Sequence, residues 1–270
     1  MSLSLSSTQL DRYSRHIIMD EIGPEGQSAL LDSHVLVVGA GGLGAPVIQY
    51  LAAAGIGTLG IVDDDAVERS NLQRQVIHGD GDVGRPKVDS AADFAADLNP
   101  DVTVNPHERR LTPDNVSELI ADSDVVVDAT DNFPTRYLLN DACRLAEIPL
   151  VNGAVYKFEG QATTIVPEGP CYRCLFPEAP DPGTVPDCAT TGVLGALPGT
   201  IGCMQATEVV KLLTDIGKPL VGTLLSYDAT DFAVERVPYQ QSADCPVCGD
   251  DGIESVREVE YTDSCRITAE

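Results

Sequence analysis

The sequence contains no tryptophan, few other aromatic residues and no long apolar run. Phe, Trp and Tyr make up 5% of the 270 residues, whereas hydrophobic residues reach 43%, so the core must be built from aliphatic side chains. No apolar stretch approaches the roughly 18 residues that a membrane helix needs. The first 16 residues lack the basic segment followed by an apolar segment that marks a secretion signal. We therefore expect a cytoplasmic protein that does not bind membranes.

Basic residues are scarce as well. The chain has 17 Lys and Arg against 42 Asp and Glu, a net charge of −25. Such a surface repels nucleic acids and anionic membranes, which argues against a nucleic-acid-binding role. The acidic residues are spread along the chain rather than grouped in a tail. This even distribution favours adaptation to high salt, as in halophilic proteins, over binding of a basic partner as the reason for the acidic composition.

The first half of the chain alternates between strand and helix patterns. Residues 34–65 predict a strand, a glycine-rich turn, a helix and a second strand. The first of these strands is apolar throughout, which is typical of a parallel strand buried on both faces. Further helices are expected over 86–98, 112–121 and 133–146, and further strands over 102–105 and 124–130. This alternation predicts an α/β protein with a doubly wound, Rossmann-like sheet.

After residue 149 the pattern changes. In residues 149–167 and 222–237 apolar and polar residues alternate and turn residues occur, which predicts antiparallel strands. Between these two segments we expect a helix over about 200–214. We expect one domain over 31–250, parallel in its front half and mixed in its back half. A helical arm (1–30) precedes it, with a short helix over 8–16, and a polar tail (251–270) follows. Thr8 and Asp11 resemble a capping box for that short helix.

A nucleotide site is predicted at residues 39–44, which satisfy G-x-G-x-x-G between a strand and a helix. Glycines let the backbone approach phosphates, and the helix start offers unpaired N–H groups. Asp63 ends the second strand, where a carboxylate can accept both ribose hydroxyls. Alone, these features favour an NAD-dependent oxidoreductase. That alternative needs a hydride-transfer site, and the four histidines form no such arrangement.

Four of the few basic residues follow within 19 positions: Arg69, Arg74, Arg85 and Lys87. In so acidic a chain this clustering indicates a highly charged phosphate group. A triphosphate fits better than a dinucleotide, because departure of pyrophosphate needs cations on the β- and γ-phosphates. The alternative is ordinary surface ion pairs, which suits Arg69 and Arg85 better than Arg74 and Lys87.

Asp131 follows a predicted buried strand directly, so we expect it at the carboxyl edge of the sheet, where ligands bind in open α/β folds. A carboxylate beside a triphosphate suits Mg²⁺. The alternative role is an N-cap for the helix that starts at Phe133.

The cysteines predict a metal site. Cys171 and Cys174 form one C-x-x-C pair, and Cys245 and Cys248 form a second. Four thiolates suit zinc and leave no open coordination position, so the zinc would be structural. The alternative is two redox dithiols, but the matched set favours zinc.

Seven motifs occur in a fixed order: "RYSRHI", "GAGGLG", "SNLQRQ", "GRPKV", "ATDN", "CYRCLFP" and "CPVCG". Over about residues 8–250 this order resembles the ubiquitin-activating-enzyme-like adenylyltransferases of the MoeB/ThiF type, including archaeal activators of ubiquitin-like proteins. The resemblance implies a homodimer in which ATP adenylates the C-terminal Gly-Gly carboxylate of a small ubiquitin-like protein. It implies an ATP site formed by Gly42, Asp63, Ser70, Asn71, Leu72, Gln73, Arg74, Lys87, Asp131 and Asn132. Arg15 resembles the family's arginine finger, which reaches the phosphates of the other subunit.

Cys188 lies alone in a stretch rich in Gly, Thr and Pro, and it resembles the loop cysteine of this family. An acyl-adenylate is an activated carboxylate that a nearby thiolate would take as a thioester. The alternative is an incidental thiol, with adenylation as the only chemistry. Cys143 and Cys203 fall within predicted helices, where we expect them to be buried packing residues.

The resemblance implies that adenylation feeds protein conjugation, sulfur transfer to molybdopterin and tRNA, or both. The sequence stops soon after the second C-x-x-C pair, without an appended sulfurtransferase domain. We therefore expect any sulfur donor to be a separate protein. A different class of function is a non-catalytic protein that is stabilised by zinc and binds nucleotide as a sensor. Such a protein would bind the nucleotide without turning it over.

Overall fold

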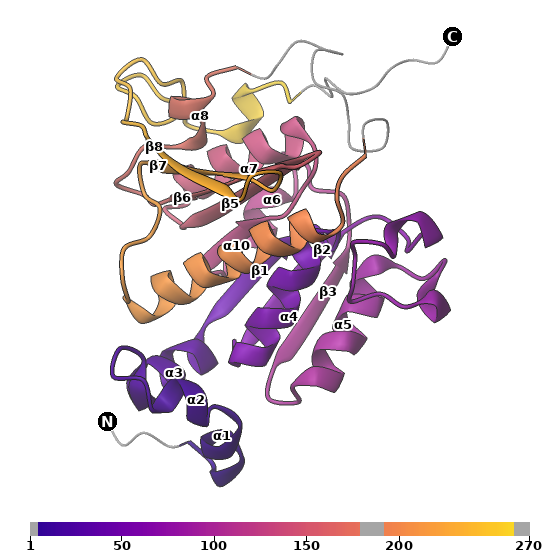
Figure 1. The fold of residues 1–270 in the computed structure, drawn as a ribbon. Coiled ribbons are helices and arrows are strands. Elements are labelled where there is room, and N and C mark those ends of the chain that lie inside the picture. The colour runs from indigo at the N-terminus through magenta and orange to yellow at the C-terminus, as the bar shows by residue number, and fades with distance from the viewer. Residues whose placement is uncertain (1–4, 179–191, 262–270) are drawn as a thin grey trace.

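The computed structural model of the protein describes residues 5–178 and 192–261. In these ranges eight strands form one sheet in the order β3-β2-β1-β4-β5-β6-β7-β8 (Figure 1). The pairs from β3 to β5 are parallel and those from β5 to β8 are antiparallel, so the predicted change from a parallel to a mixed half is confirmed. The strands are β1 (His34–Val38), β2 (Thr58–Asp63), β3 (Thr103–Glu108), β4 (Val125–Asp128), β5 (Leu150–Tyr156), β6 (Glu159–Ile165), β7 (Thr223–Asp228) and β8 (Ala233–Pro238).

Helices cover both faces of the sheet. One face carries α4 (Gly44–Ala54), α5 (Lys87–Leu98) and α10 (Ala196–Thr214), and the other carries α6 (Val116–Ile120) and α7 (Phe133–Leu145) (Figure 1). The N-terminal arm is formed by α1 (Ser7–Arg12), α2 (Ser14–Ile17) and α3 (Gly23–Asp32), and the first C-x-x-C pair carries the short α8 (Tyr172–Leu175). Single 3₁₀ turns lie at Arg69–Asn71, Asp80–Asp82 and Val256–Glu258.

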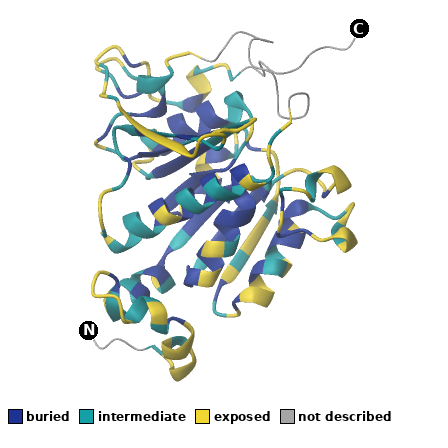
Figure 2. Ribbon diagram, viewed as in Figure 1, coloured by how far each residue is buried: buried dark blue, intermediate teal, exposed yellow. Residues whose placement is uncertain are grey.

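The core is aliphatic, as expected from the lack of aromatic residues, and it has two layers. Successive side chains of a strand point to opposite faces. In β1, Val35 and Val37 therefore join the core under α4, α5 and α10, whereas Leu36 and Val38 join the core under α6 and α7. Figure 2 shows the buried strands between the two helical layers. The carboxyl ends of β1, β2 and β4 consequently meet at one rigid edge.

The predicted helix over 8–16 is interrupted, and its predicted cap is wrong. The capping box uses Ser6 and Gln9 rather than Thr8 and Asp11. α1 ends before Tyr13, whose ring turns inward and accepts a hydrogen bond on its hydroxyl from Asn99 Nδ2 at 2.8 Å. A Cβ atom added at Gly55, where φ is +83°, would lie 2.5 Å from that ring. The arm is thus fixed against the turn before β2, and burial of Tyr13 decides where the helix breaks.

Three other boundaries differ from the predictions. Pro86 is the N-cap of α5 rather than its first residue. The predicted helix over 112–121 begins only at Val116, because Asn115 Oδ1 accepts from the Thr112 N–H at 2.8 Å and closes a turn. α10 begins at Ala196, before the expected start. Across the described ranges, no helix combines the length and the apolar character that crossing a membrane requires.

Candidate functional site

A cavity of about 780 Å³ opens at the carboxyl edge of the parallel strands. Its wall runs from the glycine-rich turn and the end of β2, past the loop after β4, to β5, β6 and α8. Of the predicted nucleotide-site residues, it is lined by Gly42, Asp63, Asn71, Arg74, Lys87, Asp131 and Asn132. The structure thus brings together residues that are up to 90 positions apart in the sequence.

The glycine-rich turn passes close to neighbouring backbone. Gly39 adopts φ +101°, and a Cβ atom there would lie 2.6 Å from the carbonyl oxygen of Ala129. At Gly44, an added Cβ would lie 1.8 Å from the carbonyl oxygen of Gly39. α4 begins at Gly44, so the unpaired N–H groups of its first turn lie beside this bend. The arrangement suits a phosphate group.

Lys87 is a fixed cation in the wall of this cavity. Its side chain is 7% exposed, and its Nζ lies 2.6 Å from Asp65 Oδ2 and 4.0 Å from Asp63 Oδ1. Asp63 is itself held in place, because it accepts hydrogen bonds from the Ala40 N–H at 2.8 Å and the Asp65 N–H at 2.9 Å. Burial raises the pKa of the Asp63 carboxyl, and the charge of Lys87 partly opposes this rise. A negative ligand here meets an ammonium group that has little freedom to move.

The basic cluster divides as the sequence predicted. Arg69 pairs with Asp80, and Arg85 pairs with Asp82 at 2.7 Å and Asp93 at 2.6 Å. The ion-pair interpretation of these two arginines is confirmed. Arg74 instead lines the cavity and donates to the carbonyl oxygen of Ser70 at 3.4 Å.

Three predicted residues lie outside the cavity lining: Ser70, Leu72 and Gln73. The Ser70 hydroxyl donates to Glu68 Oε2 at 3.2 Å. The backbone over 69–75 turns helically, because the N–H groups of Arg74 and Gln75 both donate to the carbonyl oxygen of Asn71. Residues three or four positions apart therefore lie on the same face of this turn. The face that carries Asn71 and Arg74 borders the cavity. Gln75, on the same face, also lines it and was missed by the sequence analysis.

The loop that carries Asp131 is anchored by a buried ion pair. Arg136 Nε lies 3.1 Å from Asp128 Oδ2, and its side chain also donates to the carbonyl oxygen of Thr130 at 3.0 Å. Asn132 is the N-cap of α7, accepting from the Thr135 N–H at 3.0 Å, so the alternative capping role for Asp131 is wrong.

Arg136 was also missed by the sequence analysis. Its only sequence signal is its position four residues after the end of "ATDN", near the start of α7.

The cavity is also lined by aromatic side chains, which the motifs did not predict. Tyr137, Tyr172 and Phe176 line it, with ring centroids 5.5 Å apart for Tyr137 and Tyr172 and 5.1 Å apart for Tyr172 and Phe176. These rings come from α7 and from the segment of the first C-x-x-C pair. The cavity is therefore lined by aromatic as well as charged side chains.

The four paired cysteines gather as predicted, with all four sulfur atoms within 4.8 Å of one another. Cys171 Sγ lies 3.9 Å from Cys174 Sγ and 3.5 Å from Cys245 Sγ, and Cys174 Sγ lies 3.3 Å from Cys248 Sγ. A tetrahedral zinc with bonds of about 2.3 Å places its sulfur ligands about 3.8 Å apart. Hydrogen bonding to Cys245 and burial raise the pKa of Cys171, so a cation would be needed to hold all four groups as thiolates. The donor set and spacing fit zinc.

Arg15, one of the predicted catalytic residues, is not among the residues that line this cavity. Arg15 is exposed on α2, and α2 lies with the rest of the N-terminal arm beyond the amino-terminal ends of the parallel strands, away from the glycine-rich turn (Figure 1). Cys188 lies outside the described residues. Of the two helix cysteines, Cys143 is buried as expected, whereas Cys203 is only half-buried.

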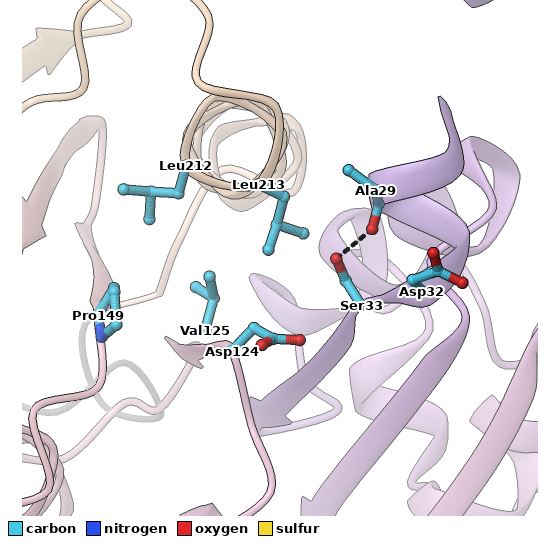
Figure 3. Close-up of a pocket in the computed structure, with 8 residues that line it drawn as sticks. All are labelled: Ala29, Asp32, Ser33, Asp124, Val125, Pro149, Leu212 and Leu213. Carbon is cyan, nitrogen blue, oxygen red and sulfur yellow. Dashed lines mark hydrogen bonds between the residues drawn. The ribbon is translucent and has the colours of Figure 1, made fainter. Parts of the chain in front are cut away.

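A second cavity, of about 420 Å³, lies at the amino-terminal edge between α3, α10 and the starts of β4 and β5 (Figure 3). Its lining combines aliphatic side chains, among them Val125, Leu212 and Leu213, with the polar residues Asp32, Ser33 and Asp124. The carboxylate of Asp124 there already accepts a hydrogen bond from the His34 N–H at 2.8 Å. It lacks the converging cations of the larger cavity, which remains the candidate site.

His78 supports the glycine-rich turn and gives a pH prediction. Its Nε2 lies 2.9 Å from the carbonyl oxygen of Ala40, and since a carbonyl only accepts, Nε2 donates and Nδ1 accepts from the Ser90 hydroxyl at 2.9 Å. Burial lowers the pKa of His78 below its ordinary 6.5. Below pH 6.5 the unfolded chain therefore takes up a proton that the folded protein does not, so this residue makes stability fall as the solution becomes more acidic.

The H78Q variant, whose amide can still donate to Ala40, is expected to lose less stability than wild type between pH 7.5 and pH 5.5. Urea unfolding at the two pH values measures both changes. An equal loss in the two proteins would contradict the buried, neutral state of His78.

Comparison with known proteins decides the family. A model of the ThiF family matches residues 13–247. The chain belongs to the ThiF family. It is 69% identical over 268 residues to the SAMP-activating enzyme E1 of Haloferax volcanii, covering 99% of each chain. It is 51% identical over 249 residues to the sulfur carrier protein adenylyltransferase of Thermus thermophilus, covering 90% of this chain and 92% of that one.

Solved structures agree on the fold. The structure of Escherichia coli MccB with ATP superposes with a TM-score of 0.77 at 23% identity, covering 90% of this chain and 75% of that chain. The family match and the two similar enzymes confirm the predicted identity as an adenylyltransferase of the ThiF family, and the alternative of an NAD-dependent oxidoreductase is wrong.

Proposed function

We propose that the protein uses ATP to adenylate the C-terminal carboxylate of a small ubiquitin-like or sulfur-carrier protein that ends in Gly-Gly. The observation that carries the proposal is a single cavity that is lined both by the glycine-rich turn with Lys87 and Asp131 and by the aromatic side chains of Tyr137, Tyr172 and Phe176. The glycine-rich turn and Lys87 suit a triphosphate. The aromatic side chains would border the chain terminus of the partner. The names of the two similar enzymes, a SAMP-activating enzyme and a sulfur carrier protein adenylyltransferase, support adenylation of a small protein.

In the proposed reaction a carboxylate oxygen of the partner attacks the α-phosphorus of ATP. The bond between the α-phosphorus and the bridging oxygen breaks, and pyrophosphate leaves with the electron pair. Negative charge grows on the departing group, where Lys87 and Arg74 would stabilise it. Asp131 would hold Mg²⁺, which supplies further positive charge to the phosphates. Asp63 would accept the ribose hydroxyls with the lone pairs that its two backbone contacts leave.

The protein would act as a homodimer. Arg15 lies at the opposite edge of the sheet from the cavity of its own chain, so within one chain it is badly placed to touch the phosphates. An arginine finger reaching the cavity of a second copy is compatible with its exposed position.

Zinc bound by Cys171, Cys174, Cys245 and Cys248 would be structural, because four thiolates complete its tetrahedral coordination. The metal would tie the segment after β8 to α8, which are about 70 residues apart in the sequence.

After adenylation, Cys188 would accept the acyl group as a thioester, with AMP leaving as the sulfur–carbon bond forms. The product would serve protein conjugation, sulfur transfer to molybdopterin and tRNA, or both. Sulfur would come from a separate donor protein.

ATP–pyrophosphate exchange in high salt, with and without a Gly-Gly-ended partner, tests the adenylation. We expect exchange that requires the partner and that survives in C188S, because the thiol acts only after the adenylate has formed. Exchange lost in C188S would contradict the proposed order of steps. Nucleotide binding with no exchange for any such partner would favour the nucleotide-sensor alternative.

A further inference from the structure

The cysteine cluster and the proposed nucleotide cavity meet at one residue. Tyr172 lies between Cys171 and Cys174 in the sequence and begins α8. Its side chain is 4% exposed, and it lines the cavity wall. A single aromatic ring thus borders both the metal-binding segment and the substrate space.

The ring of Tyr172 supports the side chain that anchors the Asp131 loop. The guanidinium carbon of Arg136 lies 5.8 Å from the centre of the Tyr172 ring, within the range of a cation–π contact. Arg136 in turn donates to the carbonyl oxygen of Thr130, the residue that precedes Asp131. A continuous series of contacts therefore runs from the first C-x-x-C pair to the loop whose Asp131 is proposed to hold Mg²⁺.

α8 cannot hold this ring in place by its own hydrogen bonds. It is four residues long, and one isolated turn of helix is unstable. On one side it is tied to α7, because the Tyr172 N–H donates to Asn140 Oδ1 at 2.7 Å and Arg173 pairs with Asp141 at 2.7 Å. On its other side the sulfur cluster joins Cys171 and Cys174 to the pair at 245 and 248.

We propose that Tyr172 is a positioning residue that couples the metal site to the nucleotide cavity. With the metal bound, α8 is held from both sides, and the Tyr172 ring keeps Arg136 and the loop over 130–132 in the arrangement that binds nucleotide. The inference rests on the proposed function, because it takes the cavity to be the ATP site. Coupling between two ligands is reciprocal, so each should strengthen the binding of the other.

The Y172L variant removes the ring and leaves all four cysteines in place. Titration calorimetry of the metal-loaded protein with ATP and Mg²⁺ is expected to give a Kd raised roughly three- to tenfold, in line with the loss of one cation–π contact. Y172F keeps the ring but removes the hydroxyl that also accepts a hydrogen bond from Arg136, so its Kd should lie between those of wild type and Y172L. Y261L is the matched control, because Tyr261 donates at 2.8 Å to Asp141, the partner of Arg173, but does not line the cavity.

The reciprocal effect is measured by equilibrium titration with a zinc chelator. In wild type, saturating ATP should raise the chelator concentration that removes half of the zinc, and in Y172L this shift should disappear. A role confined to packing would lower stability without moving that shift.

A wild-type protein that binds ATP but whose zinc affinity ATP does not change would overturn the inference, whether or not Y172L folds. An unchanged ATP Kd in folded Y172L would also overturn it. A wild type that does not bind ATP at all would overturn both this inference and the proposed function.

Discussion

Replacing Lys87 with methionine is expected to lower the rate of ATP–pyrophosphate exchange about 100- to 1000-fold, the usual loss when a fixed electrostatic donor is removed from an active site. Lys87 is buried, and its Nζ is held at 2.6 Å from Asp65 Oδ2 and 4.0 Å from Asp63 Oδ1. The ammonium therefore needs no rearrangement to meet the charge that develops on pyrophosphate. Methionine fills similar space without the charge.

Arg85 provides the matched control for this experiment. It lies two positions away in the sequence, but its guanidinium pairs with Asp82 and Asp93, and it is absent from the cavity lining. R85M should keep most of the exchange activity, and thermal unfolding of both variants separates lost catalysis from lost folding. Comparable losses in folded K87M and R85M would show that general surface charge, not the cavity cation, supports the reaction.

Loss of the metal is expected to have the largest effect on stability. C245S removes one of four ligands, so the variant should lose its zinc and about 4 kcal/mol or more of unfolding free energy. Metal content by elemental analysis and urea unfolding measure the two effects together.

C203S is the control, since Cys203 is a half-buried residue of α10 that lies outside the cluster. It should keep the metal and lose no more than about 1 kcal/mol. Full metal content and unchanged unfolding in C245S would contradict the tetrahedral site. A second outcome against it would be a disulfide between the paired cysteines in the purified protein.

The sequence predicts most of the sheet because its signals are local. Unbroken apolar runs mark β1 and β4 as strands buried on both faces, and alternating residues after 149 mark the antiparallel half. The helix of the arm shows the limit of such signals. Both Ser6 and Thr8 are followed three residues later by a polar side chain, and the choice between them depends on packing of Tyr13 against Gly55, which lies 42 residues away.

The candidate site divides in the same way. The glycine-rich turn, Lys87 and Asp131 lie within recognisable motifs, so they can be predicted from the sequence. Arg136 and Tyr172 do not stand out, because an arginine at 6% exposure makes sense only beside Asp128 from a neighbouring strand, and Tyr172 lines the cavity only once α8 is folded onto α7. Such residues are recognised from contacts between elements, which no local pattern records.

The central claim is that this chain joins AMP to the carboxyl terminus of a small protein. Mass spectrometry of a purified Gly-Gly-ended partner, after incubation with the protein, ATP and Mg²⁺ together with a pyrophosphatase, tests it most directly. We expect wild type and C188S to yield a partner whose mass has increased by one AMP unit at its C-terminal glycine, and K87M to yield little of it. A partner that stays unmodified while wild type binds ATP would contradict the claim.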